Sequence, residues 1–218
     1  MGAVFLDLDG TLTDPKPGIT GAVQYALREL GLPVPDADDL EWVIGPALLD
    51  SFATLGAPDP AAALELYRAR YTDTGLFEAR VYDGIPQALD ALHGAGHHLY
   101  LMTAKPHVYA KRITAHFGLD THLQAQFGPQ LDGTFNDKAE LLAHALQRLG
   151  VDPRDAVMVG DRSYDQIAAR KNGLRFIAAD WGYGRGSELD GADLRCATPD
   201  GLANAVEAVF SSADRRSP

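Results

Sequence analysis

Short apolar runs recur along the chain, and each ends at a polar residue or a glycine. They cover residues 3–6, 99–102, 156–159 and 176–179. Apolar runs of this length without polar alternation are typical of strands buried in a parallel sheet. Between the runs, apolar residues recur at helical spacing, at positions 85, 89 and 92 and at positions 142, 145 and 149. This alternation of strands and helices predicts an α/β fold with a parallel sheet.

The alternation stops between about residues 14 and 80, where no strand pattern appears and apolar residues follow helical spacing. Ile19, Val23 and Leu27 mark one helix. Asp59 as N-cap, followed by Pro60, predicts the start of another helix. We therefore expect a helical domain of residues 15–80, inserted after the first strand of an α/β core made of residues 1–14 and 81–218.

Composition and charge narrow the possible functions. The 218 residues are 46% hydrophobic and 22% charged, with a mean hydropathy of −0.14, which is an ordinary globular balance. Nineteen Lys and Arg against 30 Asp and Glu give a net charge of −11. This charge disfavours nucleic acids and anionic membranes as partners. An anionic substrate would need a metal ion or a locally positive pocket.

The beginning of the chain and its cysteine content suggest a compartment. No basic region precedes the first apolar run, so we expect neither a signal peptide nor a membrane span. The single cysteine, Cys196, excludes a disulfide framework and fits a reducing environment. We expect a cytoplasmic protein, and the sequence leaves its oligomeric state open.

Two carboxylates follow the first apolar run, in the segment Asp7-Leu8-Asp9-Gly10-Thr11. Side chains two residues apart lie on the same side of a strand. They stand at its carboxyl end, where open α/β sheets bind their ligands. Two such close carboxylates repel each other unless a cation or a proton lies between them. The alternative, that Asp and Gly only end a strand, does not explain Asp7.

A second acidic pair follows the run 156–159. Asp161 stands at the strand end, and Asp165 lies four residues later, one turn into the next helix. Carboxylate oxygens are ligands that Mg²⁺ prefers. Ser163 is expected to act as the N-cap of that helix, and a turn without a metal is the competing interpretation.

Two further residues fit a phosphate site. Thr103 follows the strand 99–102, where a hydroxyl and backbone N–H groups can hold a phosphate, although a lone Thr there is more often a cap. Lys138 lies in the first turn of a helix capped by Asn136 or Asp137, where the helix dipole mildly disfavours a cation, although an exposed lysine is common at such a position.

In this order, the four segments resemble the motifs of the haloacid dehalogenase superfamily, in its magnesium-dependent phosphatase branch. Asp7 to Thr11 are similar to the first motif, Thr103 to the second, Lys138 to the third, and Asp161 with Asp165 to the fourth. The resemblance covers essentially the whole chain. It implies a Rossmann-like core with a helical cap of type 1. The segments 42–46, 51–52 and 81–84 resemble the phosphoglycolate phosphatase and 5′-nucleotidase-like group.

The resemblance also implies a role for each motif residue. Asp7 would be the nucleophile and form an aspartyl phosphate, and Asp9 would be the general acid and base. Phosphate contacts would come from Thr103, Lys138 and Gly10. Mg²⁺ would be bound by Asp7, the backbone carbonyl of Asp9 and Asp161, with Asp165 either binding the ion or ordering a metal-bound water. The substrate would be a small phosphorylated metabolite, with phosphoglycolate and nucleoside 5′-monophosphates as the two candidates.

Other functions remain open at this point. A sugar phosphomutase of the same superfamily would use the same four motifs. A dehalogenase is disfavoured, since those relatives lack the second aspartate, present here as Asp9. A phospho-accepting receiver domain, usually ~120 residues, has no room for the helical insert. A binding protein without catalysis is disfavoured because every motif residue is present.

Overall fold

The computed structural model describes residues 1–214, and its internal contacts divide the chain into two units. One unit comprises Met1–Thr13 together with the chain from Val81 onward, and the other comprises Asp14–Arg80. The predicted insert of residues 15–80 falls within the second unit, and its assignment as a separate domain stays a prediction. Residues 215–218 of the predicted core lie outside the described residues.

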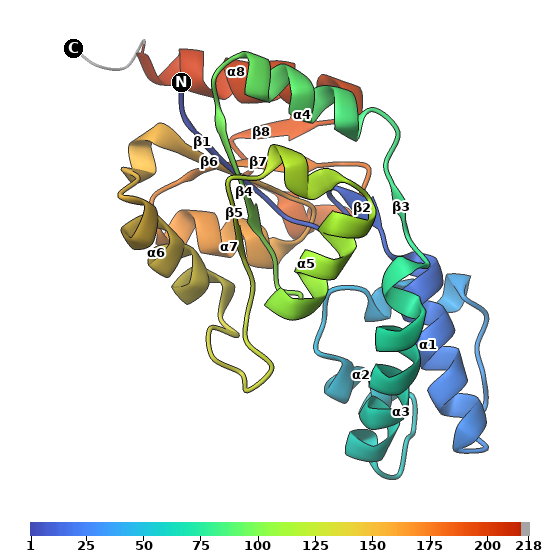
Figure 1. Cartoon of the computed structure of the whole chain (residues 1–218). Helices are drawn as coiled ribbons and strands as arrows, with labels where there is room; N and C mark the ends of the chain where they lie inside the picture. Colours follow the sequence, from blue (N-terminus) through green and yellow to red (C-terminus); the bar gives the residue numbers. More distant parts are fainter. Residues whose placement is uncertain (215–218) are drawn as a thin grey trace. The chain divides into compact units, whose positions relative to one another are not determined.

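The first unit is built on a parallel six-stranded sheet (Figure 1). Its order is β5-β4-β1-β6-β7-β8, so the first strand of the chain lies inside the sheet, between β4 and β6. The six strands are β1 (Ala3–Leu6), β4 (His98–Met102), β5 (Ala125–Phe127), β6 (Ala156–Gly160), β7 (Arg175–Ala179) and β8 (Leu194–Cys196). The α/β class and the parallel sheet predicted from the apolar runs are confirmed.

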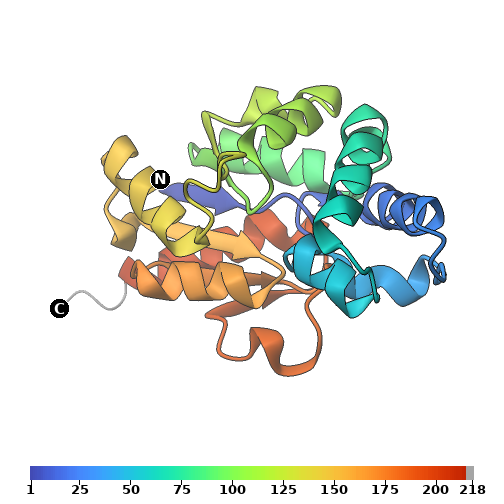
Figure 2. The ribbon, with the colours of Figure 1, turned by 90° about the horizontal axis from the view of Figure 1, so that it is seen from below.

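Helices pack on both faces of this sheet because its strands are apolar on both sides. Phe5, Met158 and Phe176 belong to a core that includes residues of α6 and α7. Figure 2 shows these two helices lying side by side, and they contact each other. Helices α4 and α8 contact each other and the sheet through β4, β7 and β8. The helices are α4 (Ile85–Gly94), α5 (His107–His116), α6 (Lys138–Leu149), α7 (Ser163–Lys171) and α8 (Leu202–Asp214).

The second unit is helical, as its apolar spacing predicts. It contains α1 (Lys16–Glu29), α2 (Leu48–Thr54) and α3 (Pro60–Asp73). The predicted start of α3 is confirmed, since the Asp59 carboxylate accepts hydrogen bonds from the N–H groups of Ala61 and Ala62 at 3.0 and 3.1 Å. Tyr67 and Tyr71 are buried and stack with their ring centres 5.2 Å apart, so they belong to the interior of this unit.

Two short strands join the units along the chain. β2 (Thr13–Asp14) and β3 (Arg80–Val81) pair as a two-stranded sheet where the chain leaves and re-enters the α/β unit. The Arg80 side chain donates a hydrogen bond from Nε to the Asp14 carboxylate at 3.1 Å. Within the described residues, no helix is long and apolar enough to cross a membrane.

Candidate functional site

The sheet order brings three predicted site residues to one edge. Asp7 follows β1, Thr103 follows β4 and Asp161 follows β6. In the ladder, Leu6 is paired with Leu101 on one side and with Val159 on the other. Because parallel strands end at the same edge, the three residues come together at the carboxyl end of the sheet.

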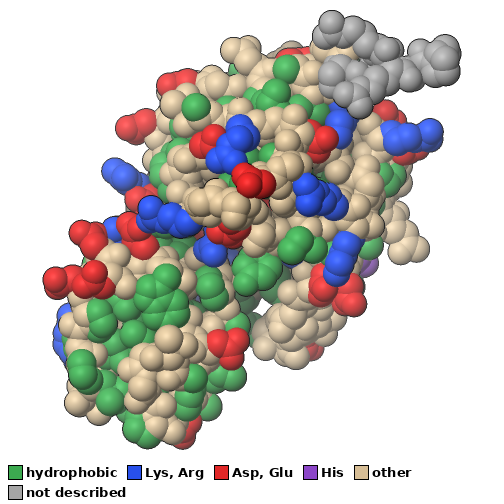
Figure 3. All heavy atoms as spheres, turned by 180° about the vertical axis from the view of Figure 1, so that it is seen from behind, with side chains coloured by type: hydrophobic (Ala, Val, Ile, Leu, Met, Phe, Trp, Pro, Cys, Tyr) green, Lys and Arg blue, Asp and Glu red, His purple; other side chains and the backbone are tan. Residues whose placement is uncertain are grey.

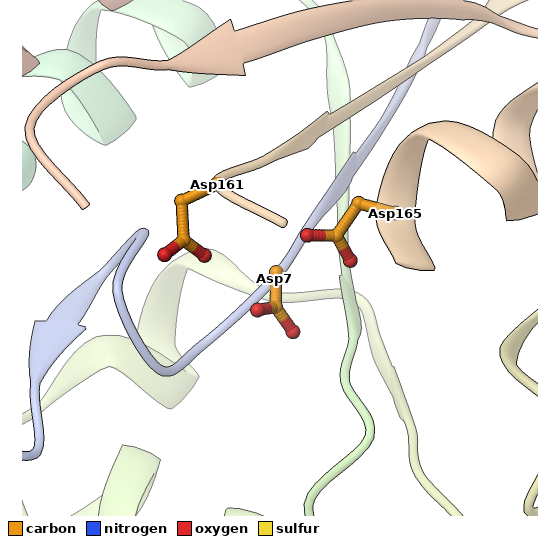
Figure 4. Close-up of side chains that lie close together, drawn as sticks. All are labelled: Asp7, Asp161 and Asp165. Carbon is orange, nitrogen blue, oxygen red and sulfur yellow. The ribbon is translucent and has the colours of Figure 1, made fainter. Parts of the chain in front are cut away.

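Three carboxylates form a buried cluster at this edge. Asp7, Asp161 and Asp165 each offer an oxygen, and these oxygens lie within 4.8 Å of one another (Figure 4). Asp7 and Asp161 come from strand ends, whereas Asp165 comes from the first turn of α7. The sequence predicted that these three residues would act together, and the structure brings them together.

Burial and the nearby carboxylates raise the pKa values of two members of this cluster, Asp161 and Asp165. Burial, followed by the nearby carboxylates of Asp7 and Asp165, raises the pKa of Asp161 well above its ordinary value. Burial also raises the pKa of Asp165, and the Lys138 ammonium opposes that rise. A positive charge among these oxygens would therefore stabilise the ionised cluster.

Lys138 provides one positive charge. It is the first residue of α6, whose N-cap Asp137 accepts hydrogen bonds from the Ala139 and Glu140 N–H groups. The Lys138 ammonium donates to Asp7 Oδ1 at 2.7 Å and forms an ion pair with Asp165. Burial alone would lower the pKa of Lys138, but these two carboxylates raise it above its usual value. The carboxylates explain why a buried cation is tolerated at the amino end of a helix.

Asp9 forms an ion pair with a lysine, Lys105, that the four sequence motifs do not include. Lys105 Nζ lies 2.9 Å from Asp9 Oδ2, while Asp9 Oδ1 is buried without a hydrogen-bond partner. Burial raises the pKa of Asp9 although Lys105 opposes the rise. The Lys105 N–H donates to the Thr103 hydroxyl oxygen at 3.1 Å, which ties Thr103 to the same turn. The signal that could have found Lys105 is its position two residues after Thr103 at a strand end.

Two glycines let the backbone come close to Asp161. Gly10 has a φ of +82°, and a Cβ there would lie 2.1 Å from Asp161 Oδ2. The Gly10 N–H donates to the Thr13 carbonyl at 2.7 Å, so the phosphate contact predicted for Gly10 would require that bond to break. At Gly182, a Cβ would lie 2.3 Å from the Asp161 Cβ. The next residue, Tyr183, donates its N–H to Asp161 Oδ2 at 2.7 Å.

The amino end of α7 differs from the prediction. Arg162 is the N-cap and Ser163 is the first helical residue, so the prediction of Ser163 as N-cap was wrong. The physical reason is that a distant carboxylate, Glu188, accepts the Ser163 N–H and hydroxyl hydrogen bonds at 2.9 and 3.1 Å. Asp165 in turn accepts a hydrogen bond from the Arg162 N–H at 3.1 Å.

The donor set fits a hard divalent cation. Such ions bind carboxylate oxygens and add a local positive charge that offsets repulsion among them. Asp7, Asp161 and Asp165 supply three buried carboxylates within one ion's reach. Asp9 does not join this group, because its carboxylate is paired with Lys105.

Comparisons with known proteins agree with this geometry. The profile of the haloacid dehalogenase-like hydrolases matches residues 4–179. A 5′-nucleotidase of Pseudomonas aeruginosa is 47% identical over 189 residues, covering 85% of this chain and 86% of that protein. The crystal structure of a predicted phosphatase from Clostridium acetobutylicum superposes with a TM-score of 0.88 at 37% identity, covering 95% of this chain and 98% of the other.

A third relative carries a different name. The tyrosine-protein kinase PtkA of Mycobacterium tuberculosis is 38% identical over 188 residues, and the match covers 86% of this chain and 65% of that protein. All of these matches span most of the present sequence. The chain therefore belongs to the haloacid dehalogenase-like hydrolases, as a phosphatase of that family.

Proposed function

We propose that this phosphatase hydrolyses small phosphomonoesters with Mg²⁺, through an aspartyl phosphate formed on Asp7. The observation that carries the proposal is the buried cluster of Asp7, Asp161 and Asp165, with Lys138 in contact with two of its members. The predicted catalytic, phosphate-binding and metal-binding roles, and the assignment of residues 15–80 as an inserted cap domain, belong to the same proposal.

Asp7 would attack the phosphorus atom. Its carboxylate oxygen forms a bond to phosphorus as the bond from phosphorus to the ester oxygen breaks. Asp9 would give a proton to that leaving oxygen and later take one from the water that hydrolyses the aspartyl phosphate. The raised pKa of Asp9 supports this role, since a general acid must hold its proton near the operating pH.

Lys138 and Thr103 would bind the transferring phosphoryl group. Lys138 already contacts Asp7, so its ammonium would stand beside the phosphoryl oxygens and reduce their repulsion by the carboxylates. Thr103 is buried at the end of the neighbouring strand β4, and its hydroxyl oxygen accepts a hydrogen bond from the Lys105 N–H. Bound Mg²⁺, held by Asp7, Asp161, Asp165 and the Asp9 carbonyl, would stabilise the negative charge that the phosphoryl group carries.

We propose that the preferred substrate is a nucleoside 5′-monophosphate rather than phosphoglycolate. The named 5′-nucleotidase is 47% identical to this chain, whereas a phosphoglycolate phosphatase from Thiobacillus denitrificans is 29% identical over 214 residues. Both names describe small phosphorylated substrates. The single buried cysteine supports a reducing compartment, and we propose the cytoplasm as the location.

The test is phosphate release from a panel of phosphomonoesters, with Mg²⁺ or with a chelator. The panel contains the ribo- and deoxyribonucleoside 5′-monophosphates, phosphoglycolate, glucose 1-phosphate and p-nitrophenyl phosphate. We expect Mg²⁺-dependent release with the highest kcat/KM for one or more of the nucleotides. The Asp7→Asn variant, prepared in parallel, controls for contaminating phosphatases.

Other outcomes would favour other functions. Conversion of glucose 1-phosphate to glucose 6-phosphate without phosphate release would favour a phosphomutase. Transfer of phosphate from ATP to a tyrosine peptide would favour the activity that the name of PtkA describes. Release that is equally fast with chelator and with Mg²⁺ would contradict the proposed metal dependence.

A further inference from the structure

Glu188 gathers hydrogen bonds from two separate segments of the α/β unit. It lies in the connection between β7 and β8, in the short 3-10 helix Gly186–Leu189. Its Oε1 accepts from Arg162 Nε at 2.8 Å, from the Ser163 N–H at 2.9 Å and from the Ser163 hydroxyl at 3.1 Å. Its Oε2 accepts from the Arg185 N–H at 3.3 Å. None of these donors belongs to the residues proposed to react or to hold the metal.

The two segments that Glu188 joins are those that orient Asp161 and Asp165. Arg162 and Ser163 lie between these two aspartates in the chain, and the Arg162 N–H donates to Asp165 Oδ2 at 3.1 Å. On the other segment, the Tyr183 N–H donates to Asp161 Oδ2 at 2.7 Å. Gly184 follows, and a Cβ on it would lie 2.2 Å from the Asp161 carbonyl oxygen. Each aspartate thus has one carboxylate oxygen that accepts a hydrogen bond from a backbone N–H of the two segments that Glu188 joins.

The hydrogen bonds of Glu188 to Arg162 and Ser163 are more than a surface ion pair. The Glu188 and Arg162 side chains are each only 19% exposed, and one Glu188 oxygen receives three donors. Hydrogen bonds to a charged group are stronger than neutral ones, and the Ser163 N–H would otherwise be an unsatisfied donor at the start of α7. Removing the carboxylate would break this link between residues 185–188 and the start of α7 and leave both backbone donors less constrained, while Gln166 of α7 still donates to the Asp190 carbonyl at 3.1 Å.

We propose that Glu188 is a positioning residue of the Mg²⁺ site, which holds Asp161 and Asp165 in place through the backbone N–H groups of Tyr183 and Arg162. This inference rests on the proposed function, because it assumes that these carboxylates bind Mg²⁺. Groups that orient metal ligands typically change metal affinity by ~10–100-fold when they are removed. Glu188 would therefore act on Mg²⁺ affinity and leave the phosphoryl-transfer step unchanged once the site is filled.

The experiment compares Glu188→Ala and Glu188→Gln with a matched control, Asp152→Asn. Asp152 also accepts hydrogen bonds from an arginine side chain and a backbone N–H, both of Arg154, but it lies in the connection before β6. Titration calorimetry without substrate gives the Kd for Mg²⁺, and phosphate release at varied Mg²⁺ gives the activation constant and kcat. Unfolding in chelator shows whether each variant is folded.

We expect Glu188→Ala to raise the Kd for Mg²⁺ by about tenfold or more, with an equal rise in the activation constant and a near-normal kcat at saturating Mg²⁺. Glu188→Gln keeps an oxygen for the Ser163 N–H, so its effect should be smaller and in the same direction. It also keeps the test decisive if the alanine variant does not fold. Asp152→Asn should bind Mg²⁺ like the wild type.

Two results would overturn the inference in different ways. If the wild type binds Mg²⁺ and both Glu188 variants bind it as tightly as Asp152→Asn does, Glu188 does not position the site, and the proposed function stands. If the wild type binds no Mg²⁺ and works equally well in chelator, the metal site of the proposed function is wrong, and the inference falls with it.

Discussion

The two units bury different kinds of side chain. In the described part of the helical unit, the buried polar side chains are Thr20 and Ser51. Each donates its hydroxyl to a backbone carbonyl four residues earlier, that of Lys16 or Ala47. The α/β unit buries charge instead, at one edge of its sheet, through Asp7, Asp161, Asp165, Lys105 and Lys138.

This difference in buried side chains indicates that the interior of the helical unit serves stability, whereas the buried charges of the α/β unit serve chemistry. A buried charge is costly unless it is paired, whereas a buried apolar side chain stabilises the fold. The interior of the helical unit therefore needs no further explanation than packing. Five buried charged side chains at one sheet edge are instead typical of a site that binds a ligand or reacts with it.

The surfaces differ as well. Figure 3 shows hydrophobic side chains gathered on one face of the helical unit, while Lys, Arg, Asp and Glu are mixed over the α/β unit. The large exposed apolar residues of the helical unit include Val34, Trp42 and Leu49.

Asp7→Asn should have the largest effect on activity. The amide has the shape of the carboxylate but cannot form the aspartyl phosphate, so we expect phosphate release to fall by roughly 10⁴-fold or more. Phosphate release and thermal unfolding, measured on the same preparation, separate lost chemistry from lost folding. Turnover within tenfold of the wild type would show that the buried charge of the α/β unit has another use.

Phe52→Ala tests the other side of the comparison. Phe52 is fully buried in the helical unit and meets Tyr67 edge to face, with ring centres 6.3 Å apart. Removing a buried Phe typically costs about 3–5 kcal/mol of unfolding free energy. Urea unfolding measures this loss, and hydrolysis of p-nitrophenyl phosphate at a temperature where the variant is folded should stay near the wild-type rate.

The control is Leu49→Ala, in the same helix, because Leu49 is 45% exposed. A surface substitution of this kind usually changes stability by no more than about 0.5 kcal/mol. Equal losses of stability in the two variants would contradict the view that Phe52 acts through packing.

The sequence predicted the fold where its pattern is long and regular. The four apolar runs lie in β1, β4, β6 and β7, and the three helical spacings lie in α1, α4 and α6. The Asp59-Pro60 signal marks the start of α3. β5 and β8 have three residues each, too few to show an apolar run. They form because β4 and β7 offer their free edges as partners in the ladder.

The candidate site could be predicted only in part, for a similar reason. Asp7, Thr103 and Asp161 are set by strand ends, which the pattern reveals. Lys105 and Glu188 contact residues that are far from them in the chain, Asp9 and Ser163. No spacing in the sequence shows which carboxylate a lysine will meet, so such pairs are seen only once the sheet order is known.

Mg²⁺ should stabilise the folded protein through the same cluster. An ion that binds only the folded state, at ~100 times its Kd, adds about 2.7 kcal/mol to the unfolding free energy. We expect a higher Tm with Mg²⁺ than with chelator, and we expect Asp161→Asn to lose most of that rise. Identical melting curves of the wild type with Mg²⁺ and with chelator would contradict the metal site.

The smallest effect is the pH dependence of stability in chelator. Burial, then the charges of Asp7 and Asp165, raises the pKa of Asp161 above the ordinary value of 3.8, so the folded state binds this proton more tightly than the unfolded state does. Stability is therefore lost as the pH rises from 3.8 through the raised pKa, since the carboxyl must then ionise inside the cluster. Asp161→Asn cannot ionise, so its stability relative to the wild type should rise over that interval, as measured by urea unfolding at a series of pH values.

Saturating Mg²⁺ should reverse the difference at neutral pH, because the cation binds the ionised form. A difference between variant and wild type that is constant with pH in chelator would mean that Asp161 is not held under repulsion, and the contrast between the two interiors would lose its electrostatic basis.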